Sequence, residues 1–275
     1  MRKKALGAGF ILFLTFAFST ASAGGPHAPI IFAHGLGISG KVYEDLFSFR
    51  RVFAKRGYTL YIAETPVHGT VEQRAEVLEK EIERLVPTGK FHLIGHSMGG
   101  LDARLAIDKY GLGDRVLSLT TLSTPHHGSP IADFVVRHFG GAGVAHAKSH
   151  ALLNGILGGD IQSAEDLTTE STAKFNAETP NDPRVEYFSM GFYIPEPVEI
   201  HTLALWFWVT HDMIEDAGEG QNDGLVSARS AEWGTYLGTM RGDHYSETSP
   251  IPLIGGDNYH DILDAVMDNL DREFP

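Results

Sequence analysis

The sequence predicts an α/β fold, in which helices cover both faces of a mostly parallel central sheet. Two observations indicate this fold. Short apolar runs alternate along the chain with longer segments whose apolar residues recur every three or four positions. Strands that alternate regularly with helices favour parallel pairing, because each helix carries the chain back across the sheet. The length of 275 residues, 43% of them hydrophobic, is sufficient for one such domain with an insertion.

The N-terminal segment has the pattern of an export signal. A basic stretch at residues 2–4 precedes an uncharged apolar stretch at residues 5–17, and a small-residue cleavage pattern ends at Ala23. This order predicts a secretory signal peptide over residues 1–23, so that the protein is secreted to the periplasm or the medium. The alternative is an uncleaved membrane anchor, for which the apolar stretch is short. We expect residues 24–275 to form a single domain.

Charge and composition exclude several classes of partner and chemistry. The formal net charge is −13 at pH 7 and the chain has no cysteine. An acidic surface disfavours binding to nucleic acid or to anionic lipid, whereas it leaves neutral lipid open. Without cysteine, a thiol nucleophile and thiolate metal sites are excluded.

The first half of the chain supplies most of the expected elements. The short apolar runs predict strands at residues 28–33, 58–63, 91–94 and 115–122. The amphipathic segments predict helices at residues 42–56, 71–85 and 101–110. We interpret the apolar stripe on the second of these helices as core packing.

The second half is less regular. From residue 134 to 181 the alternation stops, and the composition turns glycine-rich, apolar and nearly uncharged. We expect a lid or cap insertion here, over the active-site face; a plainly packed cap is the alternative. A strand is predicted at residues 185–190 and a helix at residues 259–270. The dense apolar patch at residues 203–209 is either core, which we favour, or part of an acyl pocket.

The candidate nucleophile is Ser97, in the pattern Gly-X-Ser-X-Gly. An apolar strand precedes the pattern and an amphipathic helix follows it, as expected for a nucleophilic serine on a tight turn. The turn is so sharp that side chains at Gly95 and Gly99 would collide with the chain. The amide of Met98 opens the following helix, where free N–H groups and a partial positive charge suit an oxyanion.

A second oxyanion donor is expected in the glycine-rich loop at residues 34–40. This loop directly follows the first predicted strand, where folds with such a serine place a backbone donor. We predict that the donor is the Leu36 amide. Gly35 and Gly37 would let the backbone approach the substrate closely.

A serine nucleophile needs a base and an acid, because its hydroxyl is too weakly acidic to attack unaided. The late histidines are His244, in a polar loop, and His260, in the C-terminal helix. Loop placement favours His244. The candidate acids are Asp212, Asp216, Asp223 and several glutamates. Asp223 is favoured over Asp216, because it alone lies in a tight Asn-Asp-Gly turn. The alternative for Asp223 is a purely turn-forming role.

Two adjacent histidines, His126 and His127, stand where a predicted strand ends. Ligand sites of open α/β sheets lie at such strand ends, so a metal-binding or catalytic role is one interpretation. We favour the other, in which these side chains shape the loop. The predicted site residues therefore include no metal ligand.

These motifs together resemble the secreted triacylglycerol lipases of the Pseudomonas and Burkholderia type, which have an α/β-hydrolase fold. The matching segments lie between residues 28 and 250, in the family's order, at His34-Gly35 and at residues 95–100, 123–133, 167–170, 222–226 and 243–244. The resemblance implies hydrolysis of acylglycerol esters through an acyl-enzyme, with Ser97 as nucleophile, His244 as base and Asp223 as its orienting acid.

The resemblance also implies oxyanion donors at Leu36 and Met98, a lid helix within residues 134–165, and a lipid or ester substrate met at a lipid–water interface. One departure concerns a structural calcium that those lipases hold near the catalytic histidine. A family aspartate ligand is replaced here by Ser246, and a glutamine ligand by Pro250. Because calcium prefers several carboxylate and carbonyl oxygens, we expect no calcium requirement and no other cofactor.

Other functions fit parts of the pattern. The same fold serves esterases, phospholipases, polyester depolymerases and amidases, which would act on a different ester or an amide. A non-catalytic binding protein is the rival from another class. Retention of a complete serine, aspartate and histidine set argues against it, since a binding scaffold has no need of all three.

Overall fold

The computed structural model describes residues 27–45, 49–140, 161–194, 205–249 and 259–275. The predicted signal peptide and residues 141–160 of the predicted insertion lie outside these described residues. Within them, no helix is both long and apolar enough to cross a membrane.

The centre of the structure is a six-stranded sheet with the order β2-β1-β3-β4-β5-β6. All five strand pairings are parallel, which confirms the predicted sheet. The strands are β1 (Ile30–Ala33), β2 (Leu60–Ile62), β3 (Phe91–His96), β4 (Val116–Leu122), β5 (Glu186–Tyr193) and β6 (Thr235–Arg241). Because the strands are parallel, the loops that follow them meet at one edge of the sheet, and the predicted site residues lie on these loops.

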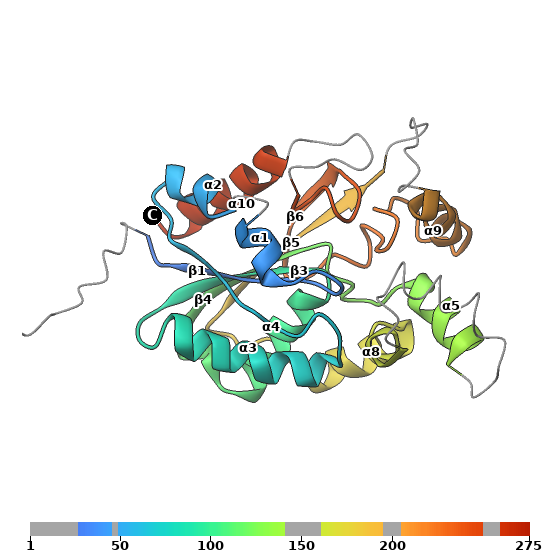
Figure 1. The fold of residues 1–275 in the computed structure, drawn as a ribbon, viewed down its shortest axis with the longest axis horizontal. Coiled ribbons are helices and arrows are strands. Elements are labelled where there is room, and N and C mark those ends of the chain that lie inside the picture. Colours follow the sequence, from blue (N-terminus) through green and yellow to red (C-terminus); the bar gives the residue numbers. More distant parts are fainter. Residues whose placement is uncertain (1–26, 46–48, 141–160, 195–204, 250–258) are drawn as a thin grey trace, which may run out of the picture.

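Helices cover both faces of this sheet (Figure 1). One face carries α1 (Gly40–Asp45), α2 (Phe49–Lys55) and α10 (Tyr259–Glu273), and the other carries α3 (Val71–Leu85) and α4 (Met98–Lys109). Successive residues of a strand alternate between the two faces. Accordingly, Ile30 and Phe32 pack with the first group of helices, whereas Ile31 and Ala33 pack with the second.

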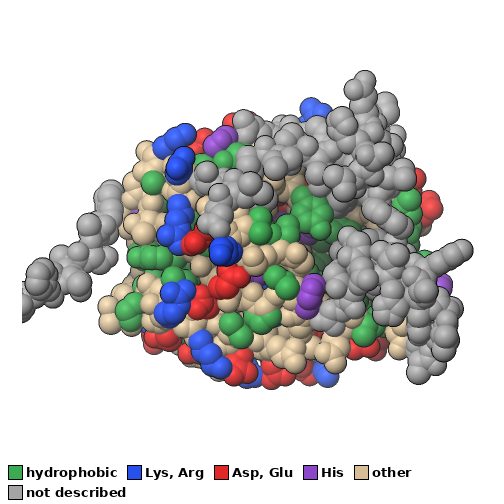
Figure 2. All heavy atoms as spheres, in the orientation of Figure 1, with side chains coloured by type: hydrophobic (Ala, Val, Ile, Leu, Met, Phe, Trp, Pro, Cys, Tyr) green, Lys and Arg blue, Asp and Glu red, His purple; other side chains and the backbone are tan. Residues whose placement is uncertain are grey.

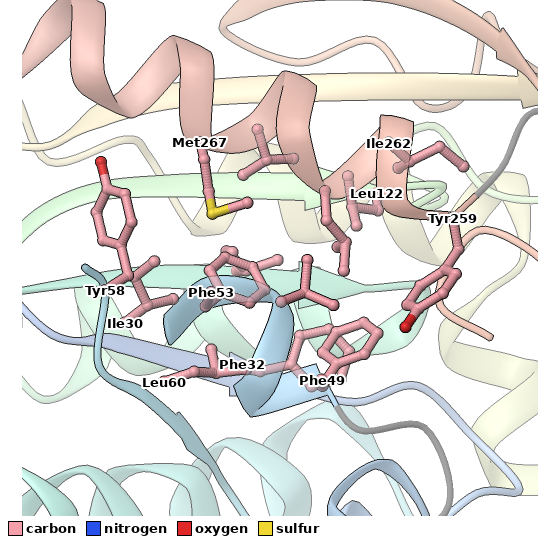
Figure 3. Packing of buried hydrophobic residues seen from close by; sticks show 14 of the residues in the cluster. Ile30, Phe32, Phe49, Phe53, Tyr58, Leu60, Leu122, Tyr259, Ile262 and Met267 are labelled. Carbon is pink, nitrogen blue, oxygen red and sulfur yellow. The ribbon is translucent and has the colours of Figure 1, made fainter. Parts of the chain in front are cut away.

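Aromatic and aliphatic side chains fill the layer between α2, α10 and the sheet (Figure 3). The ring centroids of Phe32 and Phe49 lie 5.1 Å apart, and those of Phe49 and Tyr259 lie 6.3 Å apart. Burial of each such side chain contributes about 1.5–3 kcal/mol relative to leaving it exposed. This layer fixes β1 and β3 against the helices, and both strands lead directly into the site.

Helix α3 begins with a capping box. The Thr70 hydroxyl accepts from the Gln73 amide at 3.2 Å, and the Gln73 side chain accepts from the Thr70 amide at 3.0 Å. These bonds satisfy N–H groups that the helix itself leaves free. The predicted apolar stripe is buried, and the opposite face carries ion pairs such as Glu76–Lys80. Figure 2 shows acidic and basic side chains interspersed along this part of the surface.

Two of the expected boundaries that differ from the structure concern the helix at residues 42–56 and the start of the insertion. The helix predicted at residues 42–56 corresponds to α1 and α2, and residues 46–48 between them lie outside the described part. The predicted insertion begins inside a helix, since α5 runs from Pro130 to Phe139. Ser129 caps α5 and Pro130 occupies its first turn, so the start signal lies before the glycine-rich stretch. The rest of the described insertion is α7 (Ile161–Asp166) and α8 (Thr169–Glu178).

Two further elements have no counterpart among the expected ones. The apolar patch at residues 203–209 runs into helix α9 (Leu205–Asp216), but most of its side chains lie outside the described residues, so the choice between core and acyl pocket stays open. The edge strand β6 is only half-buried and contains Gly238, which weakens its apolar alternation. Figure 1 shows α5, α8 and α9 gathered at one end of the sheet.

Candidate active site

Ser97 lies on the turn between β3 and α4, as the sequence predicts. Its backbone has φ 54° and ψ −132°, in the left-handed half of conformational space that non-glycine residues rarely adopt. The Ser97 amide donates to the Leu122 carbonyl at 2.9 Å, which ties the turn to the neighbouring strand. Strain held in this way is typical of functional positions, because the surrounding structure must enforce it.

The glycines around Ser97 are required by close backbone contacts. A Cβ atom at Gly95 would lie 2.5 Å from the Gly100 Cα atom. A Cβ atom at Gly99 would lie 2.3 Å from the Ala33 carbonyl oxygen, at the end of β1. Gly99 therefore lets α4 begin against the loop that follows β1, which brings the expected oxyanion loop next to the serine.

His244 and Asp223 complete a hydrogen-bonded chain with Ser97. The His244 Nε2 atom lies 2.9 Å from Ser97 Oγ, and its Nδ1 atom lies 2.7 Å from Asp223 Oδ2. Because the carboxylate can only accept, Nδ1 carries the proton and neutral Nε2 is free to accept one from the serine. The structure thus brings together the three side chains predicted to act, from the loops after β3 and β6 and the turn before Val226.

The environment of Asp223 keeps it ionised. Its side chain is fully buried, and its Oδ1 atom accepts from the Leu225 and Val226 amides at 2.8 and 2.7 Å. Burial opposes ionisation, but the charge and hydrogen bond of His244 outweigh it and lower the pKa of Asp223 to about 2. Asp223 therefore has both of the roles considered for it, because one oxygen forms the turn and the other orients the histidine.

The loop after β1 lies against Ser97. A Cβ atom at Gly35 would lie 2.7 Å from the Ser97 Cβ atom and 3.2 Å from its Oγ atom. The Leu36 amide follows on this loop and the Met98 amide opens α4, so both predicted donors lie on segments that contact the serine. The Gly37 amide donates to the Val67 carbonyl at 2.9 Å, which fixes the far side of the loop.

A cleft opens above Ser97 and His244. Its walls are mostly aliphatic and aromatic. Lining residues contributed by several loops, by α1 and by α5 are Leu36, Ile38, Tyr43, Ile131, Leu167 and Leu225. Such a lining suits an apolar acyl group, while the polar groups at its floor suit the reacting carbonyl.

A buried acid behind the triad was not anticipated from the sequence. Glu247 is fully buried, and its Oε1 atom accepts from the Ser123 hydroxyl at 2.7 Å. Burial and the neighbouring Asp223 carboxylate raise the pKa of Glu247 well above its ordinary value, which favours its neutral, protonated form. The sequence carries no signal for this role beyond the proximity of Glu247 to His244.

His96 stands beside this acid. Its Nε2 atom lies 3.1 Å from the His244 carbonyl oxygen and 3.3 Å from Glu247 Oε2. Burial and the charge of His244 lower the pKa of His96 to about 3, so the ring is neutral and Nε2–H donates to the His244 carbonyl. The contact with Glu247 is accordingly not an ion pair, and His96 supports the backbone of the catalytic loop.

The rival candidates lie elsewhere. His126 is buried, with Nε2 2.9 Å from the Thr121 hydroxyl, and His127 is exposed; this arrangement matches a loop-shaping role. His260 is on α10, with its ring against Tyr259. The exposed carboxylates of Asp212 and Asp216 are on α9, away from the hydrogen-bonded chain.

The described residues near His244 do not fit the calcium site that the resemblance implies. In the position of the aspartate ligand, the Ser246 hydroxyl accepts from the Asp243 amide at 2.9 Å and donates to the Asp243 carbonyl at 3.0 Å. Its oxygen is thus used within the loop. Pro250 lies outside the described residues. The absence of a calcium requirement stays a prediction.

Comparisons with known proteins agree on the fold. The family described as alpha/beta hydrolase fold matches residues 28–141. The chain is 34% identical over 204 residues to triacylglycerol lipase 2 of Saccharomyces cerevisiae, which covers 70% of this chain but only 58% of the yeast protein. It is also 29% identical over 244 residues to a triacylglycerol lipase of Vibrio cholerae, covering 79% of this chain and 76% of that protein.

Solved structures give the same result. A lipase of Bacillus licheniformis in its mature form superposes with a TM-score of 0.67 at 26% identity, covering 81% of this chain and 86% of that one. A metagenomic carboxyl esterase has a TM-score of 0.69 at 18% identity, covering 92% of this chain and 77% of that one. The second likeness is one of fold alone, and the predicted fold class is confirmed.

Proposed function

We propose, from the premise that the chain belongs to the lipase family of the α/β hydrolases, that it hydrolyses carboxylic esters and acts as a triacylglycerol lipase. The observation that carries the proposal is the unbroken chain of hydrogen bonds from Ser97 Oγ through His244 to Asp223, at 2.9 and 2.7 Å. These hydrogen-bonded side chains lie at the floor of an apolar cleft.

The proposed reaction has two halves. Ser97 Oγ forms a bond to the ester carbonyl carbon while His244 Nε2 takes its proton, and the carbonyl oxygen becomes an oxyanion held by the Leu36 and Met98 amides. The intermediate collapses, and the leaving alcohol takes the proton from His244. Water then attacks the acyl carbon of the acyl-enzyme, and His244 accepts a proton from that water. The bond between the acyl carbon and Ser97 Oγ breaks, His244 returns the proton to Ser97, and the carboxylic acid leaves.

Asp223 orients the histidine throughout this cycle. Its carboxylate accepts from Nδ1–H and stabilises the imidazolium that forms in each half-reaction. Because its pKa is lowered to about 2, Asp223 stays ionised over the whole neutral and mildly acidic range. The buried Glu247, which accepts from the Ser123 hydroxyl, lies close enough to this carboxylate for the two to influence each other's pKa.

A p-nitrophenyl ester assay tests the proposal. We expect the wild-type protein to release p-nitrophenol and Ser97→Ala to lose this activity almost completely, by about a million-fold or to the blank rate. The half-buried Ser171→Ala, on α8, is the matched control and should match the wild type. No turnover by the wild type, or equal turnover by Ser97→Ala, would refute a serine mechanism.

The choice of triglyceride as substrate rests on the apolar lining of the cleft and on the relatives. A chain-length series, given as emulsion and as monomers, separates a lipase from an esterase. We expect long-chain emulsified triglycerides to be preferred. A preference for short, soluble esters would instead assign an esterase, and turnover confined to phospholipids or amides would assign one of the other hydrolases.

We also propose export to the periplasm or the medium, after cleavage near Ala23. The basic, apolar and small-residue pattern of residues 1–23 supports it. N-terminal sequencing of the exported protein would test it, with Gly24 as the expected first residue.

A further inference from the structure

The segment at residues 65–69, between β2 and α3, contacts the oxyanion loop (residues 34–40) directly at two points and through Arg74 at a third. The Thr65 hydroxyl lies 3.1 Å from His34 Nε2. The Val67 carbonyl accepts from the Gly37 amide at 2.9 Å. The Pro66 carbonyl accepts from the buried Arg74 side chain, which also donates to the His34 carbonyl at 2.7 Å. We propose that this segment positions the Leu36 amide for the oxyanion, with Thr65 acting through His34.

The contact between His34 and Gly35 fixes the direction of the Leu36 amide. The His34 Nδ1 atom lies 2.9 Å from the Gly35 carbonyl oxygen. In the planar trans peptide that joins Gly35 to Leu36, the carbonyl and the N–H point in opposite directions. A hydrogen bond that holds the Gly35 carbonyl therefore also sets where the Leu36 N–H points.

Thr65 selects the form of His34 that can make this bond. The Gly35 carbonyl can only accept, so Nδ1 must carry a proton. Burial lowers the pKa of His34 to about 4, so the ring is neutral and Nε2 has no proton. The Thr65 hydroxyl therefore donates to Nε2, which favours this tautomer and holds the ring in plane. Thr65 and His34 are buried, so water does not readily replace the bond.

The segment is held from its other end by the cap helix α7. The Ser163 hydroxyl accepts from the Gly69 amide at 3.1 Å and donates to the Gly69 carbonyl at 2.8 Å. Asp166 Oδ2 accepts from the Val71 amide at 2.6 Å, at the start of α3. Ser163 is fully buried. The contacts thus run without interruption from α7 through residues 65–69 to the oxyanion loop.

Thr65→Val tests the role of the hydroxyl, because it keeps the side-chain shape. The inference rests on the proposed ester hydrolysis, so the assay compares a soluble p-nitrophenyl ester with its thiono analogue, in which sulfur replaces the carbonyl oxygen. Sulfur is a weak hydrogen-bond acceptor, so the hydrolysis of the thiono ester depends little on hydrogen bonds from the oxyanion donors. We expect kcat/KM for the oxygen ester to fall about fivefold, KM to stay within about twofold, and the thiono ester to change less than about twofold.

Thr120→Val is the matched control. Thr120 is fully buried in β4, and its hydroxyl has no hydrogen-bond partner among the described residues. The same chemical change at Thr120 should leave the ratio of kcat/KM for the oxygen ester to kcat/KM for the thiono ester at its wild-type value. Ser163→Ala should lower that ratio about threefold, in the direction of Thr65→Val.

Two results would overturn the inference: an oxygen-ester rate within about twofold of the wild type in Thr65→Val, or an equal loss for both esters. If Thr65→Val does not fold, the ester ratio of Ser163→Ala decides in the same way. Failure of the proposed function looks different, since the wild-type protein would then turn over neither ester.

Discussion

Asp223 shows how one side chain can serve two purposes at once. Its Oδ1 atom closes the turn through the Leu225 and Val226 amides, and its Oδ2 atom accepts from His244. A turn-forming aspartate and a catalytic aspartate were alternatives in the sequence, but the two oxygens make them compatible. Asp216, the rival acid, is exposed at the end of α9.

Asp223→Asn should therefore separate the two roles. An asparagine can still accept the turn amides through its oxygen, whereas its NH₂ group would face His244 and favour the tautomer that cannot accept the serine proton. We expect kcat to fall about 10³- to 10⁴-fold with the melting temperature little changed. Asp216→Asn is the control and should keep wild-type kcat. A large loss in Asp216→Asn instead would mean that the acid is misassigned.

Glu247 gives a prediction about stability and pH. Its pKa is raised well above its ordinary 4.5, so at higher pH the folded protein retains a proton that the unfolded chain releases. The contribution of Glu247 to the free energy of unfolding therefore falls as pH rises above about 4.5. Glu247→Gln removes this titration. The free energy of unfolding of the variant minus that of the wild type should therefore be about 1–3 kcal/mol larger at pH 8 than at pH 5.

Denaturant unfolding at the two pH values measures this difference. The exposed Glu170→Gln, on α8, is the control and should show no relative gain. Stability curves of wild type and Glu247→Gln that run parallel from pH 5 to pH 8 would contradict a neutral, buried Glu247.

Among the helices and strands, the junction of β1, β3 and α4 tolerates the least change. Gly99→Ala would place a Cβ atom 2.3 Å from the Ala33 carbonyl and 2.7 Å from the His34 carbonyl. Because both are backbone atoms, we expect a loss of about 3 kcal/mol or more in the free energy of unfolding. Gly111→Ala has open space around it but φ 66°, and should cost only about 1 kcal/mol. Equal melting temperatures for the two variants would refute the packing argument.

The elements that could be predicted are those whose own residues carry the signal. β3 and α3 are recognisable because their apolar spacing matches the strand and helix periods. β6 could not be recognised, because its pairing with β5 rather than its half-buried residues makes it a strand. α9 was missed because an apolar patch alone does not distinguish a helix from a packed loop.

The residues of the candidate site also fall into those that could be predicted from the sequence and those that could not. Ser97 could be found from its glycines, and His244 from its loop, because local pattern and chain order restrict both. Glu247 and Thr65 could not be found, since their roles depend on contacts between distant segments that leave no mark on local sequence. The resemblance to a family supplied the order of the motifs, which the spacing alone would have left ambiguous.

Considered as a whole, the molecule differs from the family it resembles in the loop after His244. The Ser246 hydroxyl bonds to the Asp243 backbone where the family places a calcium ligand. We therefore expect dialysis against EDTA to leave the melting temperature and the ester hydrolysis rate unchanged, and added calcium to restore nothing. A melting temperature that falls with EDTA and recovers with calcium, but not with magnesium, would contradict this expectation.

The reacting groups come from segments as far apart as Gly35 and His244, which the folded sheet brings together. The serine, its base and its acid are far apart in the sequence and meet only when the chain is folded. Hydrolytic activity is consequently a property of the completed sheet, and a chain that has not yet folded cannot cleave an ester by this mechanism.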